Sequence, residues 1–404
     1  MTETRRTLQL AVLTVGFAIS QAYRTVPTIA AAGISHDLAA GPTELALFSS
    51  AFHWSFALMQ IPVGVALDVF GPRRCVLTIP WFSVAGALVC CFAQDIPTLC
   101  AGQAMIGIGC APALMAAMVL ISRNWPGSRF AAISGLVLAA GSSGMLLTST
   151  PLAWVIEHSS WRAGFAVLAL ASVCTIAVSP LVLDKDPQPT QGRLAERLLP
   201  AVYGLKQVLV GRQAAALMAI GLVSYGAAIT FRGLWIVPMF MQRHDLSLIQ
   251  ASNVALFASL VMIVAPALLG RLDPGDQHRP MAISIMAFGL ALTFILFALT
   301  AHQPLWVDMM LCLVFGLFSA FMVFGYAQVR SAFPRELTGR GLTAFNMTMF
   351  IGAAVEQSSS GFLGSLAQNA GFDAINAVLL FLGGTLFIGA VCFTVLNPSP
   401  KTAS

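Results

Sequence analysis

Twelve long apolar runs dominate this sequence and leave few folds open to it. Each run holds about 20 to 30 residues, and short breaks with charged residues, proline or glycine separate the runs. About 20 residues of helix span the roughly 30 Å hydrocarbon core of a bilayer. The runs do not alternate between apolar and polar residues, so transmembrane strands are not expected. The sequence predicts an all-α membrane protein with spans near 8–34, 44–69, 75–94, 97–122, 130–157, 163–183, 213–241, 249–270, 280–301, 304–330, 339–369 and 373–396.

The composition excludes a soluble protein. Hydrophobic residues make up 58% of the 404 residues and charged residues only 9%, whereas about a quarter of a soluble domain is charged. The net charge of +5 follows the membrane topology, so no nucleic-acid partner is expected. No phosphate-binding loop for ATP, no hydrolase triad and no metalloprotease motif occurs in the sequence. We therefore expect no enzyme, no cofactor and no metal ion.

The basic residues predict which side of the membrane each connection faces. The termini and the even-numbered connections hold 17 of the 21 lysines and arginines, whereas the odd-numbered connections hold two, Arg162 and Arg243. Basic residues accumulate on the cytoplasmic side. Both termini are therefore expected in the cytoplasm, and the location is expected to be a bacterial-type inner membrane.

A polar interval at 184–212 divides the chain into two similar halves. A shift of 208 positions places Arg24 on Arg232 and His36-Asp37-Leu38 on the matching residues that begin at His244. Each half has six spans, an even number, so the repeat is parallel. We expect a first half at 1–183, a cytoplasmic linker at 184–212 and a second half at 213–404.

The connection after the second span carries a motif with a known family resemblance. It has Gly64, Asp68, Gly71, Arg73 and Arg74 at the spacing Gly-x3-Asp-x2-Gly-x-Arg-Arg, and it resembles the signature loop of the major facilitator superfamily. The resemblance implies twelve helices in two parallel-related halves, with transport by alternating access. It also implies that these five residues act in a cytoplasmic gate. The alternative is an ordinary basic loop on the cytoplasmic side.

Other segments look like one branch of that superfamily. The stretch from Ser50 to Pro62 resembles the second span of the anion:cation symporters and their organophosphate-exchanger relatives. Many superfamily members carry an arginine in the fourth span, where this chain has Gln103. Proton coupling through such an arginine is therefore not expected.

Four ionisable residues lie deep inside the spans. Counted along the helices, Arg24, His53, Arg232 and Glu356 fall in one layer, roughly 22 to 29 Å from the inner surface. Charges at this depth normally face a cavity or a partner. The resemblance implies that spans 1 and 7 line the central cavity, and a guanidinium binds carboxylate or phosphate in a two-pronged geometry. The two arginines predict a small anionic substrate, unless each has only a structural role.

The remaining candidates have two interpretations each. Glu356 either neutralises Arg232 or exchanges a proton, and His53 is either a second proton carrier or a packed neutral side chain. Further residues of these spans are candidates for the wall of the substrate site: Tyr23, Gln60, Trp235, Tyr326 and Gln328.

These observations predict a secondary active transporter of a small organic anion, coupled to protons or working by exchange. We expect a monomer in the lipid bilayer. One alternative is a drug or metabolite exporter, although two arginines near the midplane disfavour cationic cargo. Another is a copper importer that uses Met239, Met241 and His244 with Met347 and Met349, although methionine is more often apolar filler. A transporter-derived receptor would need a soluble extension, which the sequence lacks.

Overall fold

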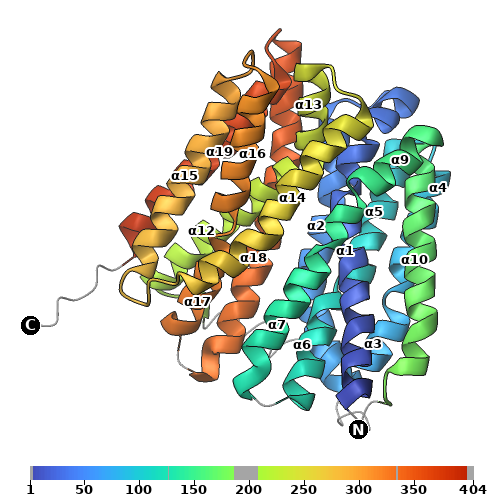
Figure 1. Cartoon of the computed structure of the whole chain (residues 1–404), viewed down its shortest axis with the longest axis vertical. Helices are drawn as coiled ribbons and strands as arrows, with labels where there is room; N and C mark the ends of the chain where they lie inside the picture. The colour runs from blue at the N-terminus through green and yellow to red at the C-terminus, as the bar shows by residue number, and fades with distance from the viewer. Residues whose placement is uncertain (1–2, 126, 186–207, 334, 398–404) are drawn as a thin grey trace, which may run out of the picture. The chain divides into compact units, whose positions relative to one another are not determined.

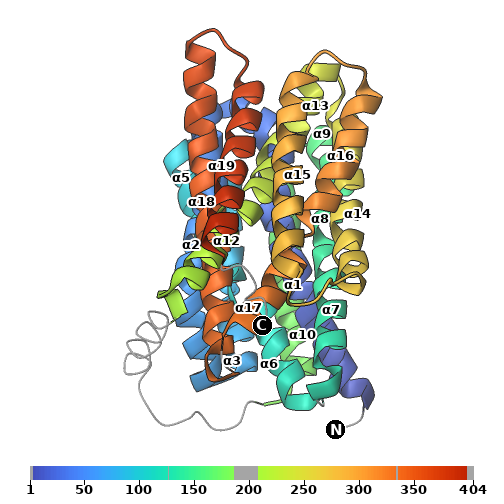
Figure 2. The same cartoon turned by 90° about the vertical axis from the view of Figure 1, so that its left-hand side faces the viewer.

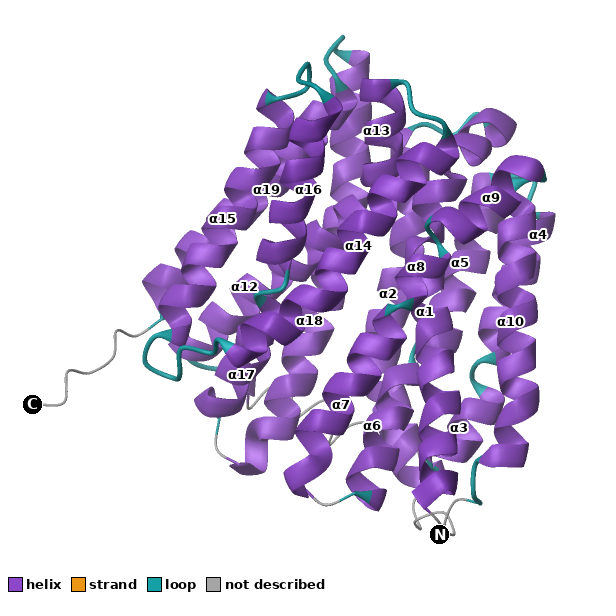
Figure 3. Cartoon of the chain, in the orientation of Figure 1, coloured by secondary structure: helices purple, strands orange, loops and turns teal. Residues whose placement is uncertain are grey.

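The computed structural model describes residues 3–125, 127–185, 208–333 and 335–397, and this part of the chain is helical, without a strand (Figure 3). The helices of the first half are α1 (Glu3–Leu38), α2 (Pro42–Phe70), α3 (Pro72–Thr78), α4 (Trp81–Phe92), α5 (Ile96–Cys110), α6 (Pro112–Asn124), α7 (Gly127–Ser142), α8 (Gly144–Leu147), α9 (Thr150–His158) and α10 (Trp161–Val182). Those of the second half are α12 (Arg212–Thr230), the π-helix η1 (Phe231–Trp235), α13 (Ile236–His244), α14 (Leu248–Arg271), α15 (Arg279–Leu299), α16 (Leu305–Ser319), α17 (Met322–Ala332), α18 (Arg335–Asn369) and α19 (Ala374–Leu396).

The helices account for the twelve expected spans. Ten helical stretches of the described chain are long and apolar enough to cross a bilayer. The other two spans are α1 and α18, with 36 and 35 residues, which carry more polar side chains, Arg24 and Glu356 among them. Helices satisfy every backbone hydrogen bond within the span, as the bilayer interior requires.

Several spans are broken within the bilayer rather than continuous. Pro80 separates α3 from α4, and Pro112 begins α6 directly after α5 ends. Proline has no backbone N–H and its ring clashes with the preceding turn, so the helical ladder is interrupted at these positions. The seventh span changes instead into the π-helix η1. Of these breaks, the π-helix η1 is the one that contains a predicted substrate-site arginine, Arg232.

The contacts divide the chain into two compact units: residues 1–40 with 51–202, and residues 41–50 with 203–404. In the first unit, α1 packs beside α6, α7 and α10, and α4 packs against α5 and α10 (Figure 1). In the second unit, α12 packs against α18 and α19, and α15 lies along α19 (Figure 2). The predicted linker at 184–212 lies for the most part outside the described residues.

Several glycines in each unit allow helix backbones to approach closely, and two of them lie at contacts of α1 and α18. A Cβ at Gly144 would overlap the carbonyl oxygen of Ala18 on α1, and a Cβ at Gly352 on α18 would overlap that of Leu222 on α12. Small residues at helix interfaces permit such close approach in membranes. These contacts hold α1, which carries Arg24, and α18, which carries Glu356, against their neighbours.

Candidate functional site

Arg24 lies inside the first unit, against aromatic rings. Its side chain is only 4% exposed, and the guanidinium carbon lies 4.5 Å from the ring centroid of Phe56 and 5.6 Å from that of Phe52. Nη2 donates a hydrogen bond of 3.4 Å to Ser20 Oγ. Cation–π contacts stabilise a charge away from water. Stacking uses the face of the guanidinium, while hydrogen bonds to an anion form in its plane.

Tyr23 points in another direction from Arg24 and ties α1 to other helices. Its hydroxyl lies 3.2 Å from Ser172 Oγ on α10, and its carbonyl oxygen accepts a hydrogen bond of 3.4 Å from Gln103 Nε2 on α5. Successive residues of a helix are rotated by about 100°, so neighbours face different elements. The geometry assigns Tyr23 to helix packing, and its predicted place in the substrate wall is not supported by these contacts.

His53 and Gln60 lie on α2 beside the aromatic rings that contact Arg24. Both are buried, at 0% and 2% exposure. The imidazole meets Phe52 edge to face at 5.2 Å, and Gln60 Nε2 donates a hydrogen bond of 3.3 Å to the carbonyl oxygen of Phe56. Phe52 and Phe56 stack on each other at 5.6 Å. Arg24 and His53 thus contact this aromatic pair, and Gln60 lies one turn after Phe56 on the same helix.

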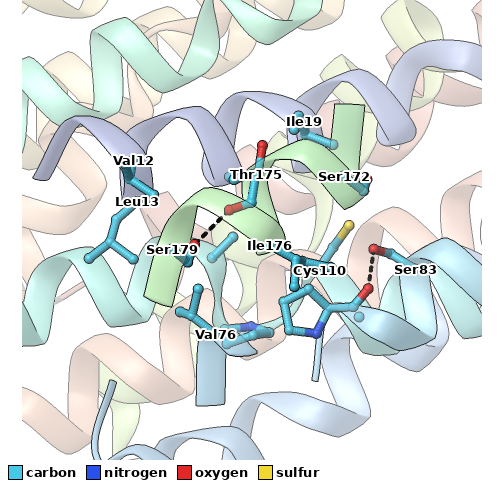
Figure 4. Close-up of a pocket in the computed structure, with 15 residues that line it drawn as sticks. Val12, Leu13, Ile19, Val76, Ser83, Cys110, Ser172, Thr175, Ile176 and Ser179 are labelled. Atoms are coloured by element: carbon cyan, nitrogen blue, oxygen red, sulfur yellow. Dashed lines mark hydrogen bonds between the residues drawn. The ribbon is translucent and has the colours of Figure 1, made fainter. Parts of the chain in front are cut away.

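A small pocket lies between α1, α10 and residues of α3 to α6 (Figure 4). Its lining includes Ser172, the residue that Tyr23 contacts. Its volume is about 50 Å³, room for a few water molecules. No charged residue lines it, and the hydroxyls of Ser179 and Ser83 donate to carbonyl oxygens of their own segments. This pocket therefore lacks the groups that would bind an organic anion.

Arg232 is buried in the second unit within the π-helix η1. It is 0% exposed, and its Nε donates a hydrogen bond of 2.6 Å to Ser259 Oγ on α14. Ser259 in turn donates to the carbonyl oxygen of Ala255 at 2.7 Å. Single π-turns inside α-helices occur frequently at functional sites. The bond at Nε fixes the plane of the guanidinium and thereby the direction of its two terminal nitrogens.

Glu356 is buried on α18 and is held by residues other than Arg232. Its Oε1 accepts a hydrogen bond of 2.9 Å from Thr385 Oγ1 on α19, and its Oε2 lies 2.8 Å from where a Cβ of Gly226 would be. Gly226 precedes Arg232 by six residues, about 9 Å of helix rise. Among the residues that the structure describes, no ion pair joins Glu356 to Arg232. The geometry favours a separate role for this carboxyl group.

Gln357 is a candidate that the sequence analysis missed. It is 0% exposed, and within the described residues neither its Nε2 nor its Oε1 has a hydrogen-bond partner. Leaving a buried polar group unpaired costs about 1–3 kcal/mol, so this amide is suited to bind a hydroxyl or a carboxylate of a substrate. The available signal was a glutamine next to Glu356 in a predicted span, although three serines follow it directly and make it less conspicuous. Nearby, Trp235 Nε1 donates a hydrogen bond of 3.0 Å to Ser360 Oγ.

Tyr326 and Gln328 lie on α17 with different surroundings. Tyr326 is 36% exposed, and its hydroxyl donates a hydrogen bond of 2.9 Å to Asn346 Oδ1 on α18. Gln328 is 6% exposed, and its Oε1 has no hydrogen-bond partner among the described residues. Tyr326 therefore links two helices, while Gln328 has a buried acceptor without a partner in this part of the chain.

The predicted gate residues lie around the junction of α2 and α3: Gly64 and Asp68 in α2, Gly71 between the two helices, and Arg73 and Arg74 in α3. Gly71 has φ 85° and ψ 164°, a conformation that is essentially restricted to glycine. Arg73 Nη2 donates a hydrogen bond of 3.2 Å to the carbonyl oxygen of Pro180, and Asp68 and Arg74 are exposed. A Cβ at Gly64 would meet nothing within 4 Å in the described structure. Backbone conformation thus explains Gly71 but not Gly64.

At the opposite end of the first unit, Asp37 joins α1 to α10. Its Oδ2 accepts hydrogen bonds of 2.9 Å from Trp161 Nε1 and 2.8 Å from Arg162 Nη1. Hydrogen bonds from His36, Trp161 and Arg162 lower the pKa of Asp37 to about 2. The carboxylate is therefore ionised at neutral pH and fastens the two helix ends together.

Comparisons with known proteins agree with this architecture. The sequence profile described as "Major Facilitator Superfamily" matches residues 12–357. A protein named "Probable galactarate/D-glucarate transporter GarP" from Escherichia coli is 22% identical over 425 residues, which cover 96% of this chain and 94% of the relative. A second relative, named "Probable galactarate/D-glucarate transporter GudP" from Bacillus subtilis, is 23% identical. The alignment covers 94% of this chain and 91% of the relative. The crystal structure of a mutant of the nucleoside transporter NupG has a TM-score of 0.78 at 13% identity, over 97% of this chain and all of that one, so the fold is the same.

Proposed function

Because this chain belongs to the Major Facilitator Superfamily, we propose that it is a secondary active transporter of a small organic anion that works by alternating access. The observation that carries the proposal is a buried arginine in each unit at repeat-equivalent positions. Arg24 is 4% exposed and Arg232 is 0% exposed. A buried guanidinium stays charged and binds carboxylates in its plane. Both arginines are assigned to substrate binding.

The candidate substrate class is a polyhydroxy dicarboxylate. Two relatives that align over nearly the whole chain are named as probable galactarate/D-glucarate transporters. Such a substrate carries two carboxylates and several hydroxyls, and the buried acceptors and donors of Gln357 and Gln328 suit the hydroxyls. Gln60 and Trp235 remain candidates for the wall of the site.

Coupling to protons is assigned to Glu356 and, as the second candidate, to His53. The Glu356 carboxyl group is buried and has a single hydrogen-bond donor among the described residues, Thr385. A carboxyl group in this position can exchange a proton with little rearrangement of its neighbours. The excess of 17 basic residues over two supports cytoplasmic termini and a position of the Asp68 loop at the inner surface. We assign a gating role to this loop.

The proposal is tested with the full chain in proteoliposomes. Uptake of radiolabelled glucarate and galactarate is measured with an inward proton gradient, without a gradient, and with unlabelled anion inside for exchange. A nucleoside, a neutral sugar and a cationic dye serve as control compounds. Saturable uptake of an aldarate or another organic anion that exceeds the controls supports the proposal. Transport of the dye alone would overturn it in favour of a drug exporter.

A further inference from the structure

A cavity with a basic rim lies at the end of the first unit where α1 begins and α10 ends. Its volume is about 180 Å³, enough for on the order of a dozen water molecules and hence for a phosphate group. It is lined by Gln9, Leu13, Pro72, Arg73, Leu120, Arg123, Asn124, Leu183, Asp184 and Lys185. The cavity is distinct from the residues assigned to the substrate.

The lining carries three cations and one anion whose charge is already compensated. Arg73, Arg123 and Lys185 line the cavity, and Asp184 forms a 2.7 Å ion pair with Arg5. In the part of the chain that the structure describes, neither Arg123 nor Lys185 forms an ion pair. The cavity therefore has a local excess of positive charge and no internal anion for two of its cations.

The walls of the cavity are held by hydrogen bonds to backbone carbonyls. Gln9 Nε2 donates a hydrogen bond of 3.1 Å to the carbonyl oxygen of Val182, and Arg6 Nη1 donates one of 3.1 Å to that of Asn124. The contact from Arg73 to Pro180 holds α3 against α10 in the same way. Leu13 and Leu120, which also line the cavity, are buried. The lining thus combines basic and apolar side chains.

We propose that this cavity binds a phosphate group, and that an anionic phospholipid of the surrounding bilayer supplies it. Arginine binds phosphate through paired N–H donors and lysine through its point charge. Basic pockets between helices near the cytoplasmic surface suit lipid headgroups, and the charge asymmetry of the chain puts this end of the unit there. Arg73 lines the cavity and is also one of the residues assigned to the gate.

The test uses the purified full chain and a double variant, Arg123→Gln with Lys185→Gln. The matched control is Arg271→Gln with Arg330→Gln, two exposed basic residues outside the cavity that change the net charge equally. Native mass spectrometry and thermal unfolding are measured with phosphatidylglycerol, with phosphatidylcholine and with inorganic phosphate. Each cation near a lipid surface contributes about 1 kcal/mol, so the double variant is expected to bind phosphatidylglycerol roughly 30-fold more weakly.

The two phosphate sources are distinguished by the ligand that stabilises the wild-type protein. A lipid site is supported if phosphatidylglycerol stabilises the wild-type protein and phosphatidylcholine does not. This stabilisation should be lost in the double variant and kept in the control variant. Stabilisation by inorganic phosphate alone, with the same dependence on Arg123 and Lys185, supports the phosphate site with a soluble occupant. Equal losses in the double variant and the control, or no stabilisation by either phosphate source, would overturn the proposal. None of these readouts depends on which anion is transported.

Discussion

Replacing Arg232 tests the proposed anion site most directly. The side chain is 0% exposed, and its Nε is bonded to Ser259 Oγ at 2.6 Å, so its place in the second unit is well defined. Removing one charged partner from a buried hydrogen-bonded pair costs about 2–5 kcal/mol. Arg232→Gln is therefore expected to weaken binding of the anion by roughly 30- to 5000-fold.

Two further variants separate charge from geometry. Arg232→Lys keeps a positive charge but loses the paired donors, so it is expected to bind the anion more tightly than the Gln variant and more weakly than the wild type. Ser259→Ala keeps the guanidinium and removes only its anchor, so it is expected to have the smallest effect of the three. Arg24→Gln, in the other unit, should weaken binding separately.

Binding is measured by isothermal titration of purified protein with glucarate or whichever anion the uptake experiment identifies. Size-exclusion profiles and thermal unfolding of each variant serve as controls for folding. If Arg232→Gln and Arg24→Gln are folded and both bind and transport the anion as the wild type does, the two arginines are structural. That result would favour the alternatives of a drug exporter or a copper importer.

The remaining predictions concern coupling, gating and topology. Glu356→Gln is expected to keep anion exchange but to lose stimulation by a proton gradient, and undiminished stimulation in proteoliposomes would exclude Glu356 as the proton carrier. Asp68→Asn is expected to leave equilibrium affinity near normal and to slow interconversion of the access states, so weaker binding with unchanged exchange rates would contradict its gating role. Gly71→Ala places a side chain at φ 85° and is expected to destabilise the first unit by about 1–3 kcal/mol. Thermal unfolding of the variant and the wild type measures this difference, and an unchanged midpoint would show that the turn can rearrange. Single cysteines are placed at two exposed positions, His278 before α15 and His302 after it. A reagent added from outside should label position 302 and not position 278, and the opposite labelling pattern would invert the topology.

The deepest polar residues were predictable from the sequence because polar groups are rare in apolar spans. Arg24, Arg232 and Glu356 stand out for this reason, and the structure buries all three. The same signal was present for Gln357, but an uncharged amide is less conspicuous than an ion. Only the tertiary structure shows that neither of its two polar atoms has a partner among the described residues.

The sequence by itself determined the twelve spans, the parallel repeat and the family. A segment that crosses a bilayer must be long and apolar, and its backbone groups must form hydrogen bonds within the segment. Such segments can be recognised from the order of the residues alone. The tertiary structure alone decided which way each side chain faces. Tyr23 meets Ser172, and Glu356 meets Thr385. A span that is apolar all round has no polar face to show its rotation, and each residue turns the direction by about 100°, so only packing against neighbouring helices settles these contacts.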